Sequence, residues 1–174
     1  MYVIEGMRME TLIIRGYPGV GKSYVGKKYD YIIDLELSDY KWIYDDKVIN
    51  MNKELRKTTP YKQLNPEYPN NYINKIKSLI GSVKVILIAP DEDIRIELDK
   101  NNIEYTICIP DKTCKEEYYN RFVNRGNTKE FIDIRIDNFD NRIEELMNQK
   151  YPLIILKSNE YLEDYLKEKG IIGD

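Results

Sequence analysis

One glycine-rich segment constrains this chain more than any other feature. Gly16–Ser23 has the sequence G-Y-P-G-V-G-K-S and fits the pattern G-x-x-x-x-G-K-[ST]. The short apolar run Leu12–Ile14 precedes it and indicates a buried strand, and Tyr24–Tyr29 can continue as a helix. Glycines let successive backbone N–H groups point into one concavity, and the helix N-terminus adds partial positive charge. Strand, loop and helix in this order predict a phosphate-binding loop, or P-loop.

The residue types in the loop predict how it binds a nucleoside triphosphate. Lys22 would reach the β- and γ-phosphates, and the Ser23 hydroxyl would ligate Mg²⁺. The alternative is an ordinary glycine-rich turn between a strand and a helix. The other expected contacts come from the loop and the start of the helix: Gly16, Pro18, Gly19, Val20, Gly21 and Tyr24.

Length and composition exclude several kinds of site. The chain has 174 residues, and we expect one domain over residues 1–174. Its net charge of -3 is too near balance to indicate a nucleic-acid-binding surface, so nucleic acid is allowed but not favoured as a partner. The chain has no histidine, so any acid–base role falls to Asp, Glu, Lys or Tyr.

The cysteines and the apolar segments bear on location. Cys108 and Cys114 are too few for a disulfide framework and favour a reducing compartment. The chain does not begin with a positively charged stretch and an apolar core, so we expect no signal peptide. No apolar run approaches the roughly 20 residues that span a bilayer. We therefore expect a cytoplasmic protein with no membrane partner; the sequence indicates no oligomeric state.

Five short apolar runs predict an α/β fold. They alternate with longer amphipathic segments, which is typical of a parallel sheet with helices on both faces. Val83–Ala89 is the longest and most β-branched run, which predicts a central strand. The five runs are Leu12–Ile14, Tyr31–Ile33, Val83–Ala89, Tyr105–Ile109 and Leu153–Leu156.

Helical spacing and capping residues predict the helices between these strands. One helix extends from Pro69 to Gly81, and Asp91 could cap another that extends to about Asn101. Thr113–Glu116 has the form of a capping box and predicts the start of a third helix.

The connection between the second and third strands is unusually long. It spans residues 35–82, whereas such connections usually have about 2–6 residues. We interpret 35–82 as an acceptor-binding excursion. Arg56 is its only arginine and the expected anchor for a phosphorylated acceptor; the alternative is a solvated basic helix face. Trp42 could stack on a base.

Acidic residues at strand ends are candidates for metal binding and proton transfer. Ligands of an open α/β sheet lie outside the carboxyl ends of the strands, so Asp34 belongs near the P-loop. Asp34 could accept a proton from an attacking hydroxyl or help to hold Mg²⁺, and Glu36 is a second candidate for substrate binding. The third strand ends in Ala89-Pro90, where an acid is expected. Asp91 follows and either touches a metal-bound water or caps the next helix.

Two arginines form the second strong feature. Arg121 and Arg125 are four residues apart on one helical face, and Gly126 then ends the helix. Guanidiniums beside a hinge could neutralise a transferring phosphoryl group and close over it, so we expect residues 113–130 to form a lid. The alternative is that Glu117 pairs with Arg121, also at a spacing of four, while Arg125 is solvated.

The order of these features resembles a known group of enzymes. P-loop, strand-end Asp34, long excursion and R-x-x-x-R lid together resemble the nucleoside monophosphate kinase-like P-loop phosphotransferases, and more closely the small P-loop nucleotide kinase-like proteins of bacteriophages. The resemblance covers roughly residues 11–166. It implies a five-stranded parallel core, MgATP as donor, Lys22 on the phosphates, Ser23 on Mg²⁺, and Arg121 and Arg125 closing from the lid. For a phage protein it implies the host cytoplasm. The segments that carry it are Gly16–Ser23, Asp34–Ser38, Asn65–Tyr72, and Arg121–Asn127 with Phe131.

The sequence therefore predicts an ATP-dependent transferase, specifically a (deoxy)nucleoside monophosphate kinase with a small-molecule nucleotide as partner. Two alternatives stay open. A kinase of a hydroxyl group, on a polynucleotide 5′-end or a small molecule, is favoured if Asp34 is a base. A nucleotide-binding regulatory protein without transferase activity is favoured by the displaced acid after Ala89. The expected catalytic residues are Lys22, Asp34, Arg121 and Arg125; the expected metal ligands are Ser23, Asp34 and Asp91; the expected substrate contacts are Asp34, Glu36 and Arg56.

Overall fold

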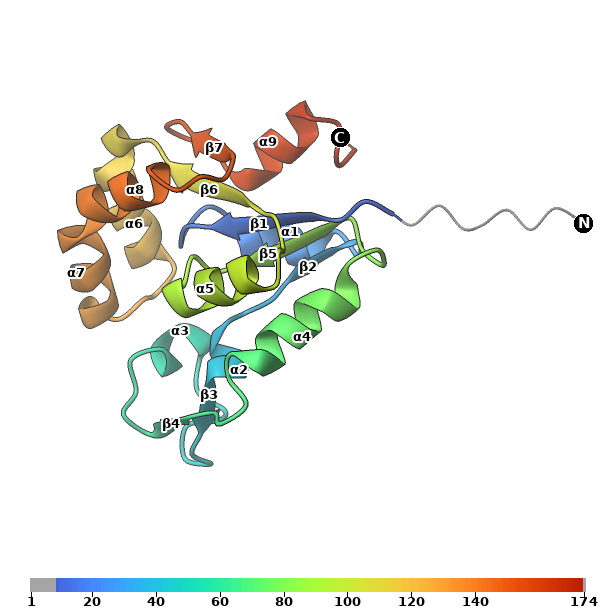
Figure 1. Ribbon diagram of the computed structural model, residues 1–174. Helices are drawn as coiled ribbons and strands as arrows, with labels where there is room; N and C mark the ends of the chain where they lie inside the picture. The colour runs from blue at the N-terminus through green and yellow to red at the C-terminus, as the bar shows by residue number, and fades with distance from the viewer. Residues whose placement is uncertain (1–8, 174) are drawn as a thin grey trace, which may run out of the picture.

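The main sheet of the computed structural model, which describes residues 9–173, contains five parallel strands in the order β2-β5-β1-β6-β7 (Figure 1). Each strand overlaps the apolar run that predicted it, and the expected α/β fold is confirmed. The expectation about a signal peptide rests largely on residues 1–8, which lie outside the described residues. The strands are β1 (Leu12–Gly16), β2 (Ile32–Asp34), β5 (Val85–Ile88), β6 (Thr106–Pro110) and β7 (Leu153–Leu156).

Strand β1 lies in the middle of this sheet. Leu12 pairs with Val85 of β5, and Ile14 pairs with Thr106 of β6. Strands β5 and β2 lie on one side of β1, and strands β6 and β7 lie on the other side. Such a sheet binds its ligands outside the carboxyl ends of the strands, where the strand order reverses, and the P-loop follows β1 at that point. Strand β5 is buried along its whole length, as its apolar run predicts, but β1 is the central strand.

Helices pack around the main sheet; they are α1 (Lys22–Lys28), α4 (Asn70–Leu79), α5 (Glu92–Lys100), α6 (Lys115–Asn124), α7 (Lys129–Asp137), α8 (Phe139–Met147) and α9 (Leu162–Glu168). Helices α1 and α9 contact each other on one face, and α4 and α5 contact each other on the opposite face (Figure 1). Helix α8 packs against β6, and α6 against α7. Within residues 9–173, no helix is long and apolar enough to cross a membrane.

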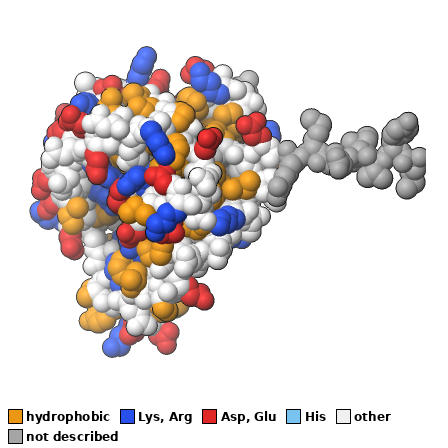
Figure 2. All heavy atoms as spheres, in the orientation of Figure 1, with side chains coloured by type: hydrophobic (Ala, Val, Ile, Leu, Met, Phe, Trp, Pro, Cys, Tyr) orange, Lys and Arg blue, Asp and Glu red, His pale blue; other side chains and the backbone are white. Residues whose placement is uncertain are grey.

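The excursion between β2 and β5 begins with α2 (Ser38–Lys41), β3 (Trp42–Tyr44), α3 (Lys53–Arg56) and β4 (Lys62–Leu64), and α4 completes it. Strands β3 and β4 pair antiparallel and form a small second sheet. This part extends away from the main sheet at the bottom of Figure 1. Figure 2 shows hydrophobic side chains on its surface, and Ile43 and Leu64 are among the exposed ones.

The start of α6 differs from the expected capping box. The Asp111 carboxylate accepts hydrogen bonds from the backbone N–H of Thr113 at 2.9 Å and from its hydroxyl at 2.7 Å. A 3₁₀ turn, η1 (Lys112–Cys114), follows, and α6 begins at Lys115. The capping-box prediction is wrong because the Thr113 hydroxyl donates to a charged acceptor two residues earlier, which leaves it unavailable to cap α6.

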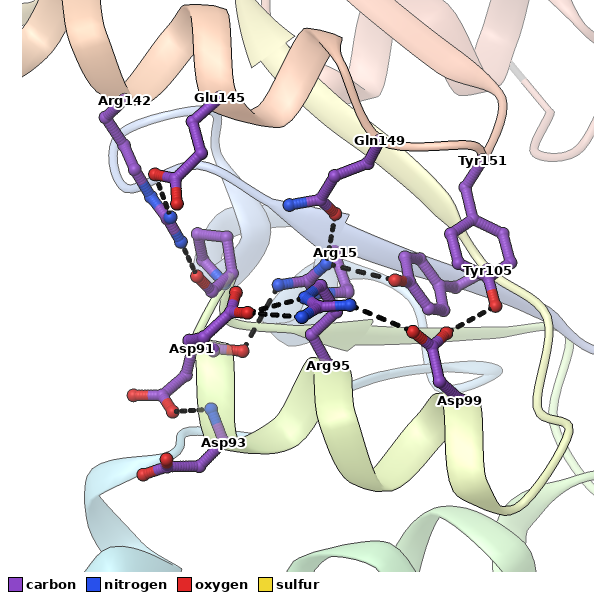
Figure 3. Close-up of polar contacts among 12 residues, drawn as sticks. Arg15, Asp91, Asp93, Arg95, Asp99, Tyr105, Arg142, Glu145, Gln149 and Tyr151 are labelled. Atoms are coloured by element: carbon purple, nitrogen blue, oxygen red, sulfur yellow. Dashed lines mark hydrogen bonds and ion pairs between the residues drawn. The ribbon is translucent and has the colours of Figure 1, made fainter.

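Arg15, in the central strand, is fully buried among neutral partners (Figure 3). Its guanidinium donates to Gln149 Oε1 at 2.9 Å, to the Asp91 carbonyl at 3.2 Å and to the Tyr105 hydroxyl at 3.3 Å. Burial lowers the pKa of Arg15, because the charge is desolvated. These contacts tie β1 to the start of α5, to the residue that precedes β6 and to the segment that precedes β7.

We expect Arg15→Ala to lower the free energy of unfolding by about 3 kcal/mol, because it opens a cavity and breaks these hydrogen bonds. Arg15→Met keeps most of the buried volume and should cost only about 1 kcal/mol. Urea unfolding at pH 7 measures both. If both variants lost the same free energy of unfolding, packing of the Arg15 side chain would not be the main source of the destabilisation.

Candidate functional site

A cleft of about 1150 Å³ opens between the carboxyl ends of the strands, helices α6 and α7, and the excursion. It brings most of the predicted site residues together. Gly16, Val20 and Arg56 do not line it: Gly16 ends β1, and Val20 is buried in the core. The predicted residues that line it are Pro18, Gly19, Gly21, Lys22, Ser23, Tyr24, Asp34, Glu36, Asp91, Arg121 and Arg125.

The P-loop backbone depends on two glycines. Gly19 and Gly21 have φ of +88° and +101°, which L side chains rarely adopt. A Cβ at Gly19 would meet the rings of Phe122 and Tyr118 at 3.2 and 3.3 Å, and one at Gly21 would meet Tyr161 at 3.3 Å. The loop therefore curls tightly enough for α6 and the start of α9 to pack directly on it.

Lys22, the first residue of α1, turns its ammonium back into the loop. Its Nζ donates to the carbonyls of Gly16 at 2.6 Å and Tyr17 at 3.3 Å. Burial lowers the pKa of Lys22 to about 8, although Asp34 and Glu36 nearby favour the charged form. A phosphate in the loop would attract this ammonium more strongly than two carbonyls do.

Asp34, at the end of β2, accepts a hydrogen bond from the Ser23 hydroxyl at 2.9 Å. Burial raises the pKa of Asp34, and the nearby Lys22 and Ser23 oppose that shift. Helix α1 can approach β2 this closely because Gly26 has no side chain: a Cβ there would lie 2.8 Å from the Asp34 Cβ. The P-loop hydroxyl and the strand-end carboxylate thus form a pair at the mouth of the loop.

The donor set fits Mg²⁺, provided that phosphate oxygens complete it. A hydroxyl and a carboxylate are the oxygen ligands that Mg²⁺ prefers, and it usually takes only one or two carboxylates plus phosphates. Within residues 9–173, no group of three or more His, Cys, Asp and Glu could hold a metal by itself. Ser23 and Asp34 would therefore hold the ion together with a nucleotide rather than before one arrives.

Asp91 behaves as a cap rather than a metal ligand. Its Oδ1 accepts from the Asp93 N–H at 3.1 Å and from the Tyr68 hydroxyl at 3.1 Å, and its Oδ2 accepts from Lys41 Nζ at 3.1 Å. Both carboxylate oxygens are therefore engaged by the protein, which favours the capping alternative.

Arg121, on α6, stabilises the P-loop by hydrogen bonding to its backbone. Its guanidinium donates to the carbonyls of Gly19 and Glu160, both at 2.9 Å, and pairs with Glu117. It also stacks on the ring of Tyr161, 3.8 Å from the centroid. The alternative Glu117–Arg121 pair is therefore present, whereas Arg125 pairs with Glu54 instead of being solvated. Arg121 is committed to backbone oxygens that fix the loop, although it lines the cleft.

Arg125 and Arg56 have separate environments. Arg125 reaches across to the excursion, where its Nη2 lies 3.0 Å from Glu54 Oε2. Arg56 donates to the Ile49 carbonyl at 3.0 Å and lies over the Tyr44 ring at 4.7 Å. It turns away from the cleft because α3 places it on the side that faces this aromatic ring. The expected acceptor anchor is therefore not at the site.

The structure adds Arg135, a cleft residue that the sequence analysis missed. It extends from α7 over the Phe131 ring, 5.2 Å from the centroid, and its guanidinium makes no hydrogen bond or ion pair with any other residue in 9–173. Burial lowers the pKa of Arg135. Phe131 and Arg135 are four apart on α7, so their spacing places them on one face, but nothing local in the sequence says that this face meets the cleft.

Comparisons with known proteins do not identify a family: no family model matches the chain, and no curated protein does.

The pKa of Lys22 leads to a testable pH dependence. Lys22 must be charged to attract phosphate, so we expect the affinity for ADP without metal to fall as the pH rises through about 8. Above that pKa the fall should approach about tenfold per pH unit. The terminal phosphate of ADP is almost completely ionised near pH 8, since its last proton leaves near pH 6.

Lys22→Arg is the control, because its guanidinium stays charged throughout. Calorimetric titration between pH 7 and 9.5 should give a flat profile for this variant. A wild-type profile equally flat would contradict the assignment of Lys22 to the phosphates.

Proposed function

We propose that this protein is an ATP-dependent, Mg²⁺-assisted phosphotransferase that acts on a (deoxy)nucleoside monophosphate. One observation carries the proposal: the P-loop, the Ser23–Asp34 pair and three arginines face one cleft, and the excursion closes its other side. The arginines are Arg121 on α6, Arg125 just after α6 and Arg135 on α7. A P-loop alone serves many nucleotide-binding proteins. A second wall that bears its own side chains gives room for an acceptor beside the donor.

The residues support catalysis by positioning and charge neutralisation. Lys22 exchanges its two carbonyl partners for the β- and γ-phosphates. Arg135, which has no acidic partner in the described residues, neutralises charge on the transferring group or the acceptor phosphate. Ser23 and Asp34 would hold Mg²⁺, which would supply further charge neutralisation at the phosphate oxygens. Arg121 keeps the loop in shape through Gly19.

Aromatic rings on the acceptor side fit a planar base. Trp42 from β3 and Phe131 from α7 both line the cleft. Lys62 lies 4.6 Å from the Trp42 ring centroid, and Arg135 lies 5.2 Å from that of Phe131. Rings covered by cations suit a ligand that combines an aromatic base with negative charge.

A second candidate, a kinase of hydroxyl groups, is favoured by Glu36. Its Oε1 accepts from the Ser38 hydroxyl at 3.1 Å, and it lines the cleft close to Lys22. Since Asp34 would hold Mg²⁺ together with Ser23, Glu36 is the cleft carboxylate left to take a proton from a hydroxyl acceptor. A third candidate, a nucleotide-binding regulator without transferase activity, is favoured by Asp91, whose carboxylate is fully engaged.

A coupled assay of ADP release separates these three. Nucleoside monophosphates should raise turnover, whereas an oligonucleotide 5′-hydroxyl should not. Turnover with the hydroxyl acceptor alone would establish the second candidate, and the Glu36→Gln variant should then lose about 10²-fold or more. Bound ATP with no turnover on any acceptor would leave the regulatory protein.

Lys22→Ala tests the P-loop directly. We expect turnover to fall roughly 10²- to 10³-fold, because a cation that stabilises the transferring phosphoryl group is lost. Lys100→Ala is the matched control: Lys100 pairs with Glu97 on α5 and does not line the cleft. Circular dichroism should show both variants folded. An unchanged rate in Lys22→Ala would refute the proposed mechanism.

A further inference from the structure

A single carboxylate joins the two walls of the cleft. Glu54 lies on α3 of the excursion, and its Oε2 accepts from Arg125 Nη2 at 3.0 Å and from Asn127 Nδ2 at 2.6 Å. Arg125 and Asn127 follow the end of α6, more than 70 residues further along the chain. Lys57 adds a third cationic or polar donor, 3.1 Å from the same oxygen. Beside them, the hydroxyls of Thr58 and Thr128 form another link at 3.1 Å.

The bridge is only partly shielded from solvent. Asn127 is 8% exposed, and the side chains of Glu54 and Arg125 are 21% and 35% exposed. Burial alone would raise the pKa of Glu54, but Lys57 and Arg125 outweigh it and hold the pKa below its ordinary value. Glu54 is therefore ionised at neutral pH and engages Arg125 as an anion.

This anion stands where a phosphate could bind. Glu54, Lys57 and Arg125 all line the cleft that holds Lys22 and Ser23. A guanidinium, an amide and an ammonium that converge on one oxygen form the kind of donor set that a phosphate oxyanion takes. A phosphate that approaches these donors meets the negative charge of Glu54 and competes with it.

We infer that Glu54 is an internal competitor of the nucleotide: it occupies Arg125 and Asn127 in the free protein and yields them to a phosphate oxyanion of the bound ligand. The inference rests on the proposed function, since it assumes that a nucleotide occupies the cleft. Displacement frees Arg125 and also weakens the link between the excursion and the segment after α6, where the Thr58–Thr128 hydrogen bond remains. Nucleotide binding is thereby coupled to the opening and reclosing of the cleft.

Glu54→Gln tests the inference, because the amide keeps the shape of the side chain and removes its charge. The apparent dissociation constant of a ligand rises by the inverse of the fraction of protein competent to bind. Ion pairs of this exposure are modest, so we expect Glu54→Gln to bind ADP, with Mg²⁺ present, about three- to tenfold more tightly than wild type. Glu54→Ala, which removes the bridge entirely, should change the affinity in the same direction.

Two further variants identify the origin of any gain in affinity for ADP. Glu97→Gln removes the same charge from α5, where Glu97 pairs with Lys100 outside the cleft, and should bind ADP like wild type. Adding Arg125→Ala to Glu54→Gln should abolish the gain. A gain that persists without Arg125, or appears in Glu97→Gln, reflects net charge and overturns the inference.

The outcomes also separate this inference from the proposed function. Equal or weaker ADP binding by Glu54→Gln, in calorimetric titrations where wild type binds, overturns the inference and leaves the function standing. Absence of ADP binding by every variant and by wild type overturns both. Thermal unfolding of each variant confirms that the compared proteins are folded.

Discussion

The left-handed backbone at Gly19 and Gly21 is the constraint on which the rest of this structure depends. It curls the loop after β1 so that Lys22 turns inward and α1 begins with its N–H groups towards the cleft. It also brings the loop against Tyr118 and Tyr161, so that α6 and the start of α9 pack on a segment of backbone rather than on side chains. Arg121 locks this contact by holding the carbonyls of Gly19 and Glu160.

Four arginines have different roles because the groups around their guanidiniums differ. Arg15 is buried among neutral acceptors and ties the central strand to its surroundings. Arg121 binds backbone oxygens and shapes the loop, and Arg125 is neutralised by Glu54. Arg135 faces the cleft without an acidic partner among the described residues and is the guanidinium most available to a phosphate. Sequence spacing distinguishes none of these roles, because Arg15, Arg121 and Arg125 contact distant segments and the exposure of Arg135 to the cleft depends on how α7 packs.

The sequence predicts the sheet well, because each strand is a short apolar run and burial of both faces demands that composition. It predicts the P-loop and the position of Asp34 for a similar reason: local chemistry and the topology of the sheet determine them. The small β3–β4 sheet was not predicted, since its three-residue strands are half-exposed and too short to show an alternation of apolar and polar residues. Arg56 was misplaced and Arg135 missed because the orientation of α3 and α7 towards the cleft is set by tertiary packing.

We propose that the cleft transfers a phosphoryl group from ATP to a nucleotide held on the excursion side. Phosphorus NMR of ATP, Mg²⁺ and a nucleoside monophosphate with the protein tests this transfer, with Lys22→Ala as the blank. We expect the γ-phosphate resonance of ATP to disappear while the β-phosphate resonance of a new nucleoside diphosphate grows at the same rate. Conversion of ATP to inorganic phosphate alone, or ATP resonances that shift on binding and then persist, would contradict it.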